Sequence, residues 1–436
     1  MGCSSSKTID SVLEPMRKIH NSPRKESESV HSSPKVISYE KENLPLEDVL
    51  DRLLESENAG LKSLVELCKM NGISASSTLS LQGHIIKQDA ELLSNLLLYL
   101  TGILDVQCFE VEADDETCGI LGLGLVKQSK TLTSIDISNC ELDSIASILS
   151  HVSPMISSLS IHECSLSSSD IEAFSETNIF QSFENLERLS LFGLGLGDFP
   201  IETLSFNMHH LSSLTRLSLH HNNLTNASLS SLTEAILSDD CSSLRSQLTH
   251  LELHNNRYDV TGALELIVAL TTPSSSSEAS DDDSTPISPK LEHLSLDVVC
   301  PLGQSEEHLT KLFTTLRAYP RISRLTLGNL SLEASSQSSL DSLLSSLKLR
   351  SLALPSLGIS SADTVSALSE SILGCKHLSS LDLTGCRLDS EMCSALISPF
   401  SESTSLKRIN LSDSTLKPEE KAALRDTLKQ KKIVIL

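Results

Sequence analysis

The chain has 436 residues, no tryptophan, 3% aromatic residues and a formal net charge of −23 at pH 7. This acidic excess disfavours nucleic acid as a partner, because phosphate binding depends on clustered Lys and Arg side chains. The 11 cysteines include no Cys-x-x-Cys pair and follow no apolar signal sequence, which indicates reduced thiols in the cytosol rather than a zinc finger or a disulfide-stabilised secreted protein.

The first seven residues, Met1-Gly2-Cys3-Ser4-Ser5-Ser6-Lys7, match the myristoylation pattern in which Ser or Thr stands four residues after an N-terminal Gly. One myristoyl chain on Gly2 binds membrane only marginally, so a second signal is needed, and the neighbouring Cys3 is the candidate for palmitate. The heptapeptide resembles the N-termini of dual-acylated signalling and flagellar proteins. That resemblance implies the cytoplasmic face of a membrane, the plasma membrane or a ciliary or flagellar membrane. An unmodified solvated tail is the alternative.

Residues 1–42 are predicted to form a disordered, lipid-anchored tail, because they lack sustained apolar periodicity. Ser22 and Ser33 are each followed by a proline and then by a basic residue, which is typical of proline-directed kinase sites. Phosphate there would add about −1.5 to −2 charges each and weaken membrane contact. Ser-Pro pairs are also common in unstructured tails, so these sites stay hypothetical.

Residues 43–75 are predicted to form a helical N-terminal cap, and a repeat begins at residue 76. The repeat places apolar residues at spacings of three, two and five, usually with Asn or Cys in the last gap. Clear copies are Leu132-Ile135-Ile137-Cys140-Leu142 and Leu214-Leu217-Leu219-Asn222-Leu224. Counting weaker copies, repeats start at Ser76, Ile103, Leu132, Ile156, Leu186, Leu214, Leu248, Leu291, Ile322, Leu349, Leu378 and Leu406.

Most of these starts lie 27 to 31 residues apart, which is long enough for a strand followed by a full helix. Residues 226–237 show such a helical pattern. The repeat resembles the ribonuclease-inhibitor type of leucine-rich repeat, which the Ran GTPase-activating protein shares. The resemblance implies, over residues 76–436, an α/β fold: a curved solenoid, or horseshoe, with a concave parallel β-sheet and convex helices.

The residue at the Asn position is expected to turn inward and satisfy backbone groups of the tight bend after the strand, as Asn222 and Asn256 would. Cys140, Cys164 and Cys386 occupy the same position and are interpreted as packed residues rather than redox or metal-binding residues. Four apolar residues there cannot make such a bond, so irregular turns are expected at Leu194, Val299, Leu330 and Leu357.

The longest spacing contains an insertion, residues 271–290, that is rich in Ser and Asp and is predicted to be a mobile loop. Ser280 is followed by three aspartates and resembles an acidophilic kinase site; an inert loop is the alternative. At the C-terminus, residues 417–432 are predicted to form a polar amphipathic helix, followed by a closing strand at residues 433–436.

Strand alternation sends the leucines inward and the residues between them to the concave face. The residues two places after the repeat starts form a first row of Arg188, Arg216, His250, His293 and Arg324. Those six places after the starts form a second row of His162, Phe192, His220, His254 and Asp297. Between the rows lie Ser160, Ser190, Ser218, Glu252 and Ser295.

This Arg- and His-rich patch suits an acidic or phosphorylated partner segment, which is expected to bind more tightly as the pH falls through ~6 and the imidazoles are protonated. A merely solvated sheet face is an equally weighted alternative. A metal ion between His220 and His254 is a minor one, since no fixed ligand spacing exists.

The leading hypothesis is a non-enzymatic, monomeric, membrane-tethered scaffold that binds a protein and needs no cofactor. Regulation of a small GTPase or phosphatase is the alternative, by analogy of fold with the Ran GTPase-activating protein. Catalysis is disfavoured because no phosphate loop, catalytic triad or metal-spaced cluster occurs in the sequence.

Overall fold

The structure is a computed structural model, and every residue that it describes lies in one compact unit that begins at Leu44. The described residues are 44–71, 77–100, 102–128, 130–151, 156–175, 179, 183–271, 290–299, 305–332, 334–358, 362–386, 388, 391–392, 395–396, 400, 403–412, 417–419, 422, 425–426 and 433–435. The candidate modification sites Gly2, Cys3, Ser22, Ser33 and Ser280 lie outside these residues, as does most of residues 271–290.

The described strands form one parallel sheet in which each strand pairs with the next along the chain, except that β4 pairs with β2. The strands are β1 Thr78–His84, β2 Asp105–Ala113, β3 Ser134–Ser138, β4 Glu141–Leu142, β5 Ser158–His162, β6 Arg188–Phe192, β7 Arg216–Ser218, β8 His250–Glu252, β9 His293–Asp297, β10 Arg324–Gly328, β11 Ser351–Ala353, β12 Ser380–Asp382, β13 Arg408–Asn410 and β14 Val434–Ile435.

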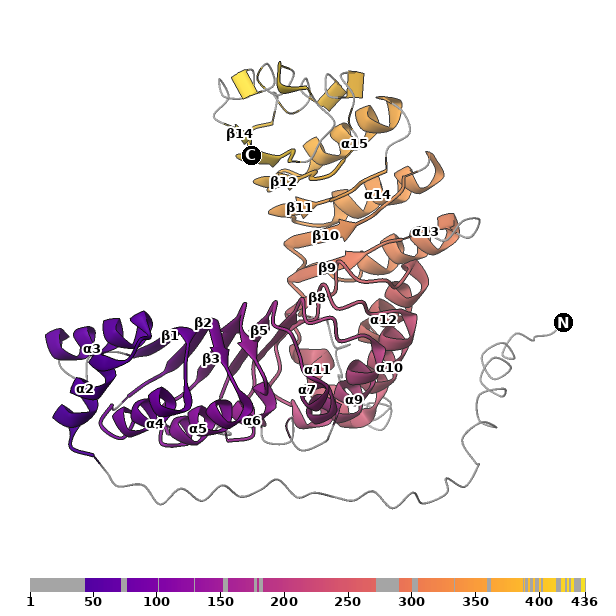
Figure 1. The fold of residues 1–436 in the computed structure, drawn as a ribbon. Coiled ribbons are helices and arrows are strands. Elements are labelled where there is room, and N and C mark those ends of the chain that lie inside the picture. The colour runs from indigo at the N-terminus through magenta and orange to yellow at the C-terminus, as the bar shows by residue number, and fades with distance from the viewer. Residues whose placement is uncertain are drawn as a thin grey trace. The chain divides into compact units, whose positions relative to one another are not determined.

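The described helices are α2 Leu46–Glu55, α3 Ala59–Asn71, α4 Lys87–Leu96, α5 Asp115–Val126, α6 Ile145–Leu149, α7 Ser168–Ser175, α9 Asp198–Asn207, α10 Asn226–Leu237, α11 Ser242–Gln247, α12 Val260–Thr271, α13 Ser305–Leu316, α14 Ala334–Ser346 and α15 Ala362–Gly374, with short 3₁₀ turns η2 Met208–His210 and η3 Asp239–Cys241. From α4 onward the helices connect the strands and line one side of the sheet, where helices of neighbouring repeats pack against one another, whereas α2 and α3 precede β1 (Figure 1). The α2 and α3 helices occupy the segment predicted as the N-terminal cap.

This architecture confirms the predicted leucine-rich-repeat solenoid. Each of the twelve predicted repeat starts is followed, two residues later, by the first residue of a strand. The α10 helix spans the predicted residues 226–237, and the Thr225 side chain caps its N-terminus by accepting a hydrogen bond from the Ala227 N–H. A closing strand is present as β14, whereas residues 417–432 lie largely outside the described residues.

Leucines of the strands form the core between the sheet and the helices. Leu217 and Leu219 of the β7 repeat are 2% and 0% exposed, and Leu251 and Leu253 of the next repeat are 1% and 0% exposed. Complete burial of such a side chain contributes about 1.5–3 kcal/mol relative to leaving it in water. Burial therefore determines which strand residues face inward, and leaves the alternate residues on the opposite side, which we call the strand face.

In almost every described repeat, one residue near the end of the strand motif has a left-handed backbone conformation. It lies seven places after the repeat start and immediately before the Asn position, as His221 (φ 60°), Asn255 (φ 57°) and Asn329 (φ 55°) do. The same turn precedes Leu194, Leu330 and Leu357, where Gly193, Asn329 and Ser356 have positive φ, so the predicted irregularity is absent there. The β9 repeat is the exception among the described turns, because Val298 has no positive φ and Val299 is 40% exposed.

Asparagine side chains at the Asn position link neighbouring repeats. The Asn222 carbonyl oxygen accepts a hydrogen bond from the Leu194 N–H (3.0 Å), and that of Asn256 accepts bonds from the N–H groups of Asn222 (2.9 Å) and Leu224 (3.0 Å). Asn222 is fully buried, so its side chain satisfies backbone groups that water cannot reach. The prediction of inward-turned asparagines is confirmed.

Cysteines at this position behave in the same way. The Sγ atom of Cys140 accepts a hydrogen bond from the Val111 N–H, and that of Cys164 accepts one from the Cys140 N–H, both at 3.4 Å. Cys386 is fully buried, and burial raises the pKa of its thiol to about 11. Cys140, Cys164 and Cys386 are therefore packed in the interior of the array, as predicted.

Candidate binding surface on the strand face

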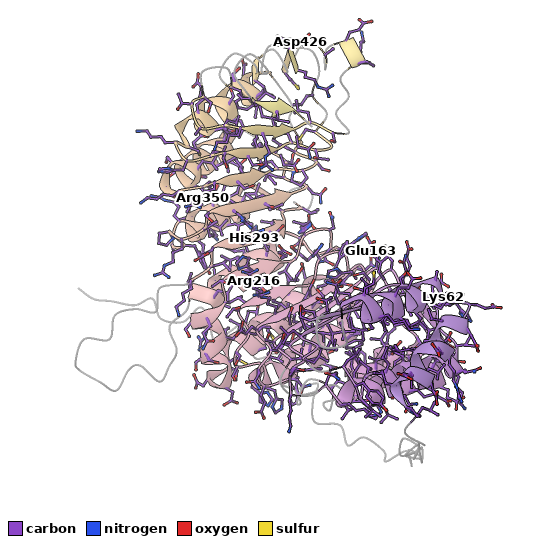
Figure 2. The ribbon with its side chains drawn as sticks, turned by 90° about the vertical axis from the view of Figure 1, so that its left-hand side faces the viewer. Lys62, Glu163, Arg216, His293, Arg350 and Asp426 are labelled. Atoms are coloured by element: carbon purple, nitrogen blue, oxygen red, sulfur yellow. The ribbon has the colours of Figure 1, made fainter. Side chains whose placement is uncertain are left out.

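The first predicted row, which we call the arginine–histidine row, is in register on five adjacent strands. Arg188 pairs with Arg216, Arg216 with His250, His250 with His293, and His293 with Arg324. The three arginines are exposed and the two histidines are half-buried. Figure 2 labels Arg216 and His293 on the strands of this part of the sheet. The row thus places three fixed positive charges on a chain whose formal net charge is −23.

The second predicted row, the ring row, consists of His162, Phe192, His220 and His254. The Phe192 ring stacks on the His220 ring with centroids 4.2 Å apart, and the His220 ring stacks on that of His254 at 4.5 Å. His162 meets Phe192 edge-on at 5.8 Å. Strand spacing of about 4.8 Å brings these rings to stacking distance.

His221 also lies close to the ring row, although its place, seven residues after the repeat start Leu214, belongs to neither predicted row. Its ring centroid is 5.8 Å from that of Phe192. The left-handed backbone of His221 turns the chain at the end of the β7 repeat and brings this second histidine near the ring of Phe192. The strand alternation rule assigns no face to a turn residue, so it did not identify this contact.

Small serines and one acidic residue, Glu252, separate the two rows. One Glu252 carboxylate oxygen accepts a hydrogen bond from the Ser218 hydroxyl (2.9 Å), and the other lies 3.3 Å from Nδ1 of His293. The Ser218 hydroxyl is also 2.7 Å from Nδ1 of His220. Glu252 therefore places a negative charge at the centre of the surface, between its positively charged ends.

Burial changes the charge that the histidines contribute. Burial is the largest cause of the lowered pKa of His220, which is about 4; nearby His254 contributes to this shift and Glu252 opposes it. Burial is also the largest cause of the lowered pKa values of His250, His254 and His293. These imidazoles are therefore protonated at a lower pH than a histidine that is exposed to water. The rise in affinity for an acidic segment, which was predicted near pH 6, is therefore expected at a lower pH. At neutral pH the positive charge of the surface comes from the arginines.

Asp297, which was predicted to lie on the second row, is 1% exposed and turns inward instead. Its carboxylate accepts hydrogen bonds from the Asn256 N–H (2.8 Å) and the Asn329 side-chain amide (3.1 Å), and burial raises its pKa. Its own N–H donates to the Tyr258 hydroxyl (2.9 Å). Asp297 thus takes the role of the Asn position in the β9 repeat, whose turn is the exception among the described turns in lacking a left-handed residue.

The geometry does not favour catalysis or metal binding at the ring row. The His220 and His254 rings are 15° from parallel and stacked face to face, so their nitrogen lone pairs, which lie in the ring planes, do not converge on one ion. Within the described residues no group of three or more His, Cys, Asp or Glu side chains is arranged to hold a metal ion. The carboxylate of Glu252 lies closer to the hydroxyl of Ser218 (2.9 Å) than to Nδ1 of His220 (3.8 Å), unlike the acid in a catalytic triad, which orients the imidazole.

No protein-family model matches the chain, and no curated protein matches it. Among solved structures, the chain is similar to an internalin of Listeria monocytogenes, with 18% sequence identity, a TM-score of 0.35, and coverage of 72% of this chain and 82% of that chain. The leucine-rich-repeat fold is established here by the chain's own repeat spacing, strand register and buried leucines. In the part of the chain that the structure describes, no helix is both long and apolar enough to cross a bilayer.

Proposed function

We propose that this protein is a non-catalytic scaffold that binds an acidic or phosphorylated segment of a partner protein on its strand face. The observation that carries the proposal is the register of Arg188, Arg216 and Arg324 in one exposed row. A guanidinium group presents a planar fork of donors that matches carboxylate and phosphate oxygens, and it stays charged at any physiological pH. The acidic remainder of the chain repels acidic partners elsewhere and directs them to this row.

We further propose that acyl chains on Gly2 and Cys3 hold the scaffold at the cytoplasmic face of a membrane. The support is the complete match of residues 1–7 to the myristoylation pattern and the adjacent thiol, since stable anchoring takes two signals. The tail, residues 1–42, would then act as a spacer between the membrane and the repeats. In this arrangement the scaffold concentrates its partner at the membrane surface.

Affinity capture tests the binding function. Full-length wild-type protein, the double variant Arg188→Glu/Arg216→Glu and the control Lys311→Glu/Arg317→Glu are used to capture proteins from a lysate of cells that express the protein. The control makes the same change in net charge at exposed positions on and just after α13, a helix on the opposite side of the sheet.

Wild type and the control should recover the same proteins at low salt, and the Arg188/Arg216 variant should lose them. Higher salt should weaken recovery by the wild type, because screening reduces attraction between exposed charges. Equal recovery by all three proteins at both salt concentrations would contradict binding at the arginine–histidine row.

A further inference from the structure

The positions of the arginines within the row specify the partner segment more closely; this inference rests on the proposed function. Arg188 and Arg216 lie on the neighbouring strands β6 and β7 and are direct register partners. Arg324 lies on β10, three strands beyond Arg216. At about 4.8 Å per strand, Arg216 and Arg324 are separated by about 14 Å. The row therefore has two positively charged ends rather than a uniform positive surface.

The centre of the row disfavours negative charge. His250 and His293 lie between the two charged ends, and the carboxylate of Glu252 contacts Nδ1 of His293 at 3.3 Å. Among the residues of β6 to β10 that point to the strand face, Glu252 is the one acidic side chain. An acidic group above this centre would be repelled by Glu252, whereas an uncharged one would not.

An extended segment fits this spacing better than a helix does. In an extended chain, residues i and i+4 point to the same side and are about 13.5 Å apart, close to the separation of the two charged ends. In an α-helix, 14 Å corresponds to about nine or ten residues, and those side chains point to different sides of the helix. The side chain at i+2 of the extended segment would lie above the centre of the row.

We propose that the arginine–histidine row binds an extended segment that crosses β6 to β10 and carries two anionic side chains at i and i+4, with an uncharged residue at i+2. One anionic group contacts Arg216, with the guanidinium group of Arg188 beside it, and the other contacts Arg324, about 14 Å from Arg216. Because two guanidinium groups can bond all the free oxygens of one phosphate, the first position suits a phosphorylated residue.

Defined peptides test the spacing. Fluorescent 11-residue peptides of Ser, Gly and Ala carry either one phosphoserine or two phosphoserines at i,i+2, at i,i+4 or at i,i+6, and their affinity for the full-length protein is measured by fluorescence anisotropy. The i,i+4 peptide should bind about tenfold more tightly than the single-phosphoserine and i,i+2 peptides, since a second charge-assisted contact contributes about 1.5 kcal/mol.

Variants locate the two contacts. Arg324→Glu and the milder Arg324→Gln should reduce the affinity of the i,i+4 peptide to that of the single-phosphoserine peptide and leave the latter within about twofold. Arg188→Glu/Arg216→Glu should abolish binding of all four peptides, and Lys311→Glu/Arg317→Glu should leave the order of affinities unchanged. All five substituted residues, Arg188, Arg216, Lys311, Arg317 and Arg324, are exposed, and Lys311 forms a surface ion pair with Glu307.

Two results would overturn the proposed i,i+4 spacing but not the proposal that the row binds an acidic partner. The first is an equal affinity for the i,i+2, i,i+4 and i,i+6 peptides. The second is an Arg324→Glu substitution that lowers the affinity of all four peptides equally. Absence of binding by every peptide would overturn both this inference and the proposal that the row binds acidic segments.

Discussion

A carboxylate oxygen of Glu252 lies 3.3 Å from Nδ1 of His293, its neighbour on the next strand of the sheet. Their side chains are 28% and 19% exposed, so water screens this contact only in part. The other Glu252 oxygen accepts the Ser218 hydroxyl hydrogen bond, which holds the carboxylate in place. Glu252 therefore supports the charged form of His293 and at the same time limits the negative charge that the row accepts.

Glu252→Gln should consequently raise the affinity of the row for anionic peptides, most of all for the i,i+2 phosphopeptide. We expect a gain of about three- to tenfold, because a carboxylate within the site repels an anion by about 1 kcal/mol at an intermediate dielectric. Gln keeps an oxygen that accepts the Ser218 bond.

The same substitution should lower the pKa values of His293 and His220 further, because Glu252 raises both of them against the effect of burial. Histidine NMR titrations of wild type and Glu252→Gln check this direction. Unchanged pKa values together with unchanged peptide affinity would show that Glu252 does not act on the row.

His220 should make the array less stable in mild acid. Its folded-state pKa of about 4 lies below the unfolded value of ~6.5, so the unfolded state binds the proton more readily. The resulting loss of stability begins as the pH falls below ~6.5 and is complete near 4. At pH 5 it should amount to about 1–2 kcal/mol for this one side chain.

Urea unfolding at pH 7.5 and pH 5, followed by circular dichroism, measures this loss. His220→Gln should lose about 1–2 kcal/mol less than wild type between the two pH values, because glutamine does not titrate. His209→Gln, at an exposed position after α9, serves as the control and should follow wild type. Identical pH dependence in His220→Gln and wild type would contradict the lowered pKa.

Gly2→Ala should move the protein from the membrane fraction to the soluble fraction, because it removes the acceptor of myristate. Cys3→Ser should leave weak, reversible association, because one acyl chain gives an association constant on the order of 10⁴ M⁻¹. Fractionation of cells that express each variant measures both effects, with Ser4→Ala as the control. A Gly2→Ala protein that stays in the membrane fraction would refute the anchor.

The periodicity of the sequence was sufficient to predict the strands, the α10 helix and the register of the arginine–histidine row. Leu217 and Leu219 must be buried, and strand geometry then leaves Arg216, Ser218 and His220 on the opposite face whatever the rest of the chain does. Equal distance from successive repeat starts also places Arg188, Arg216 and His250 side by side. Both conclusions depend on local geometry repeated along the chain.

The tertiary structure determined how the side chains on that face interact. The contact of Glu252 with His293 joins residues 41 positions apart, and the stacking of His220 on His254 joins residues 34 positions apart. Asp297 turns inward in the β9 repeat, which lacks the left-handed residue found in the other described turns, and the leucine pattern records neither feature. Burial then lowers the pKa of His220, because the charged imidazole loses water that a sequence does not locate. Repeat spacing sets the positions of the side chains, whereas their charge and partners depend on packing between repeats, which exists only in the folded array.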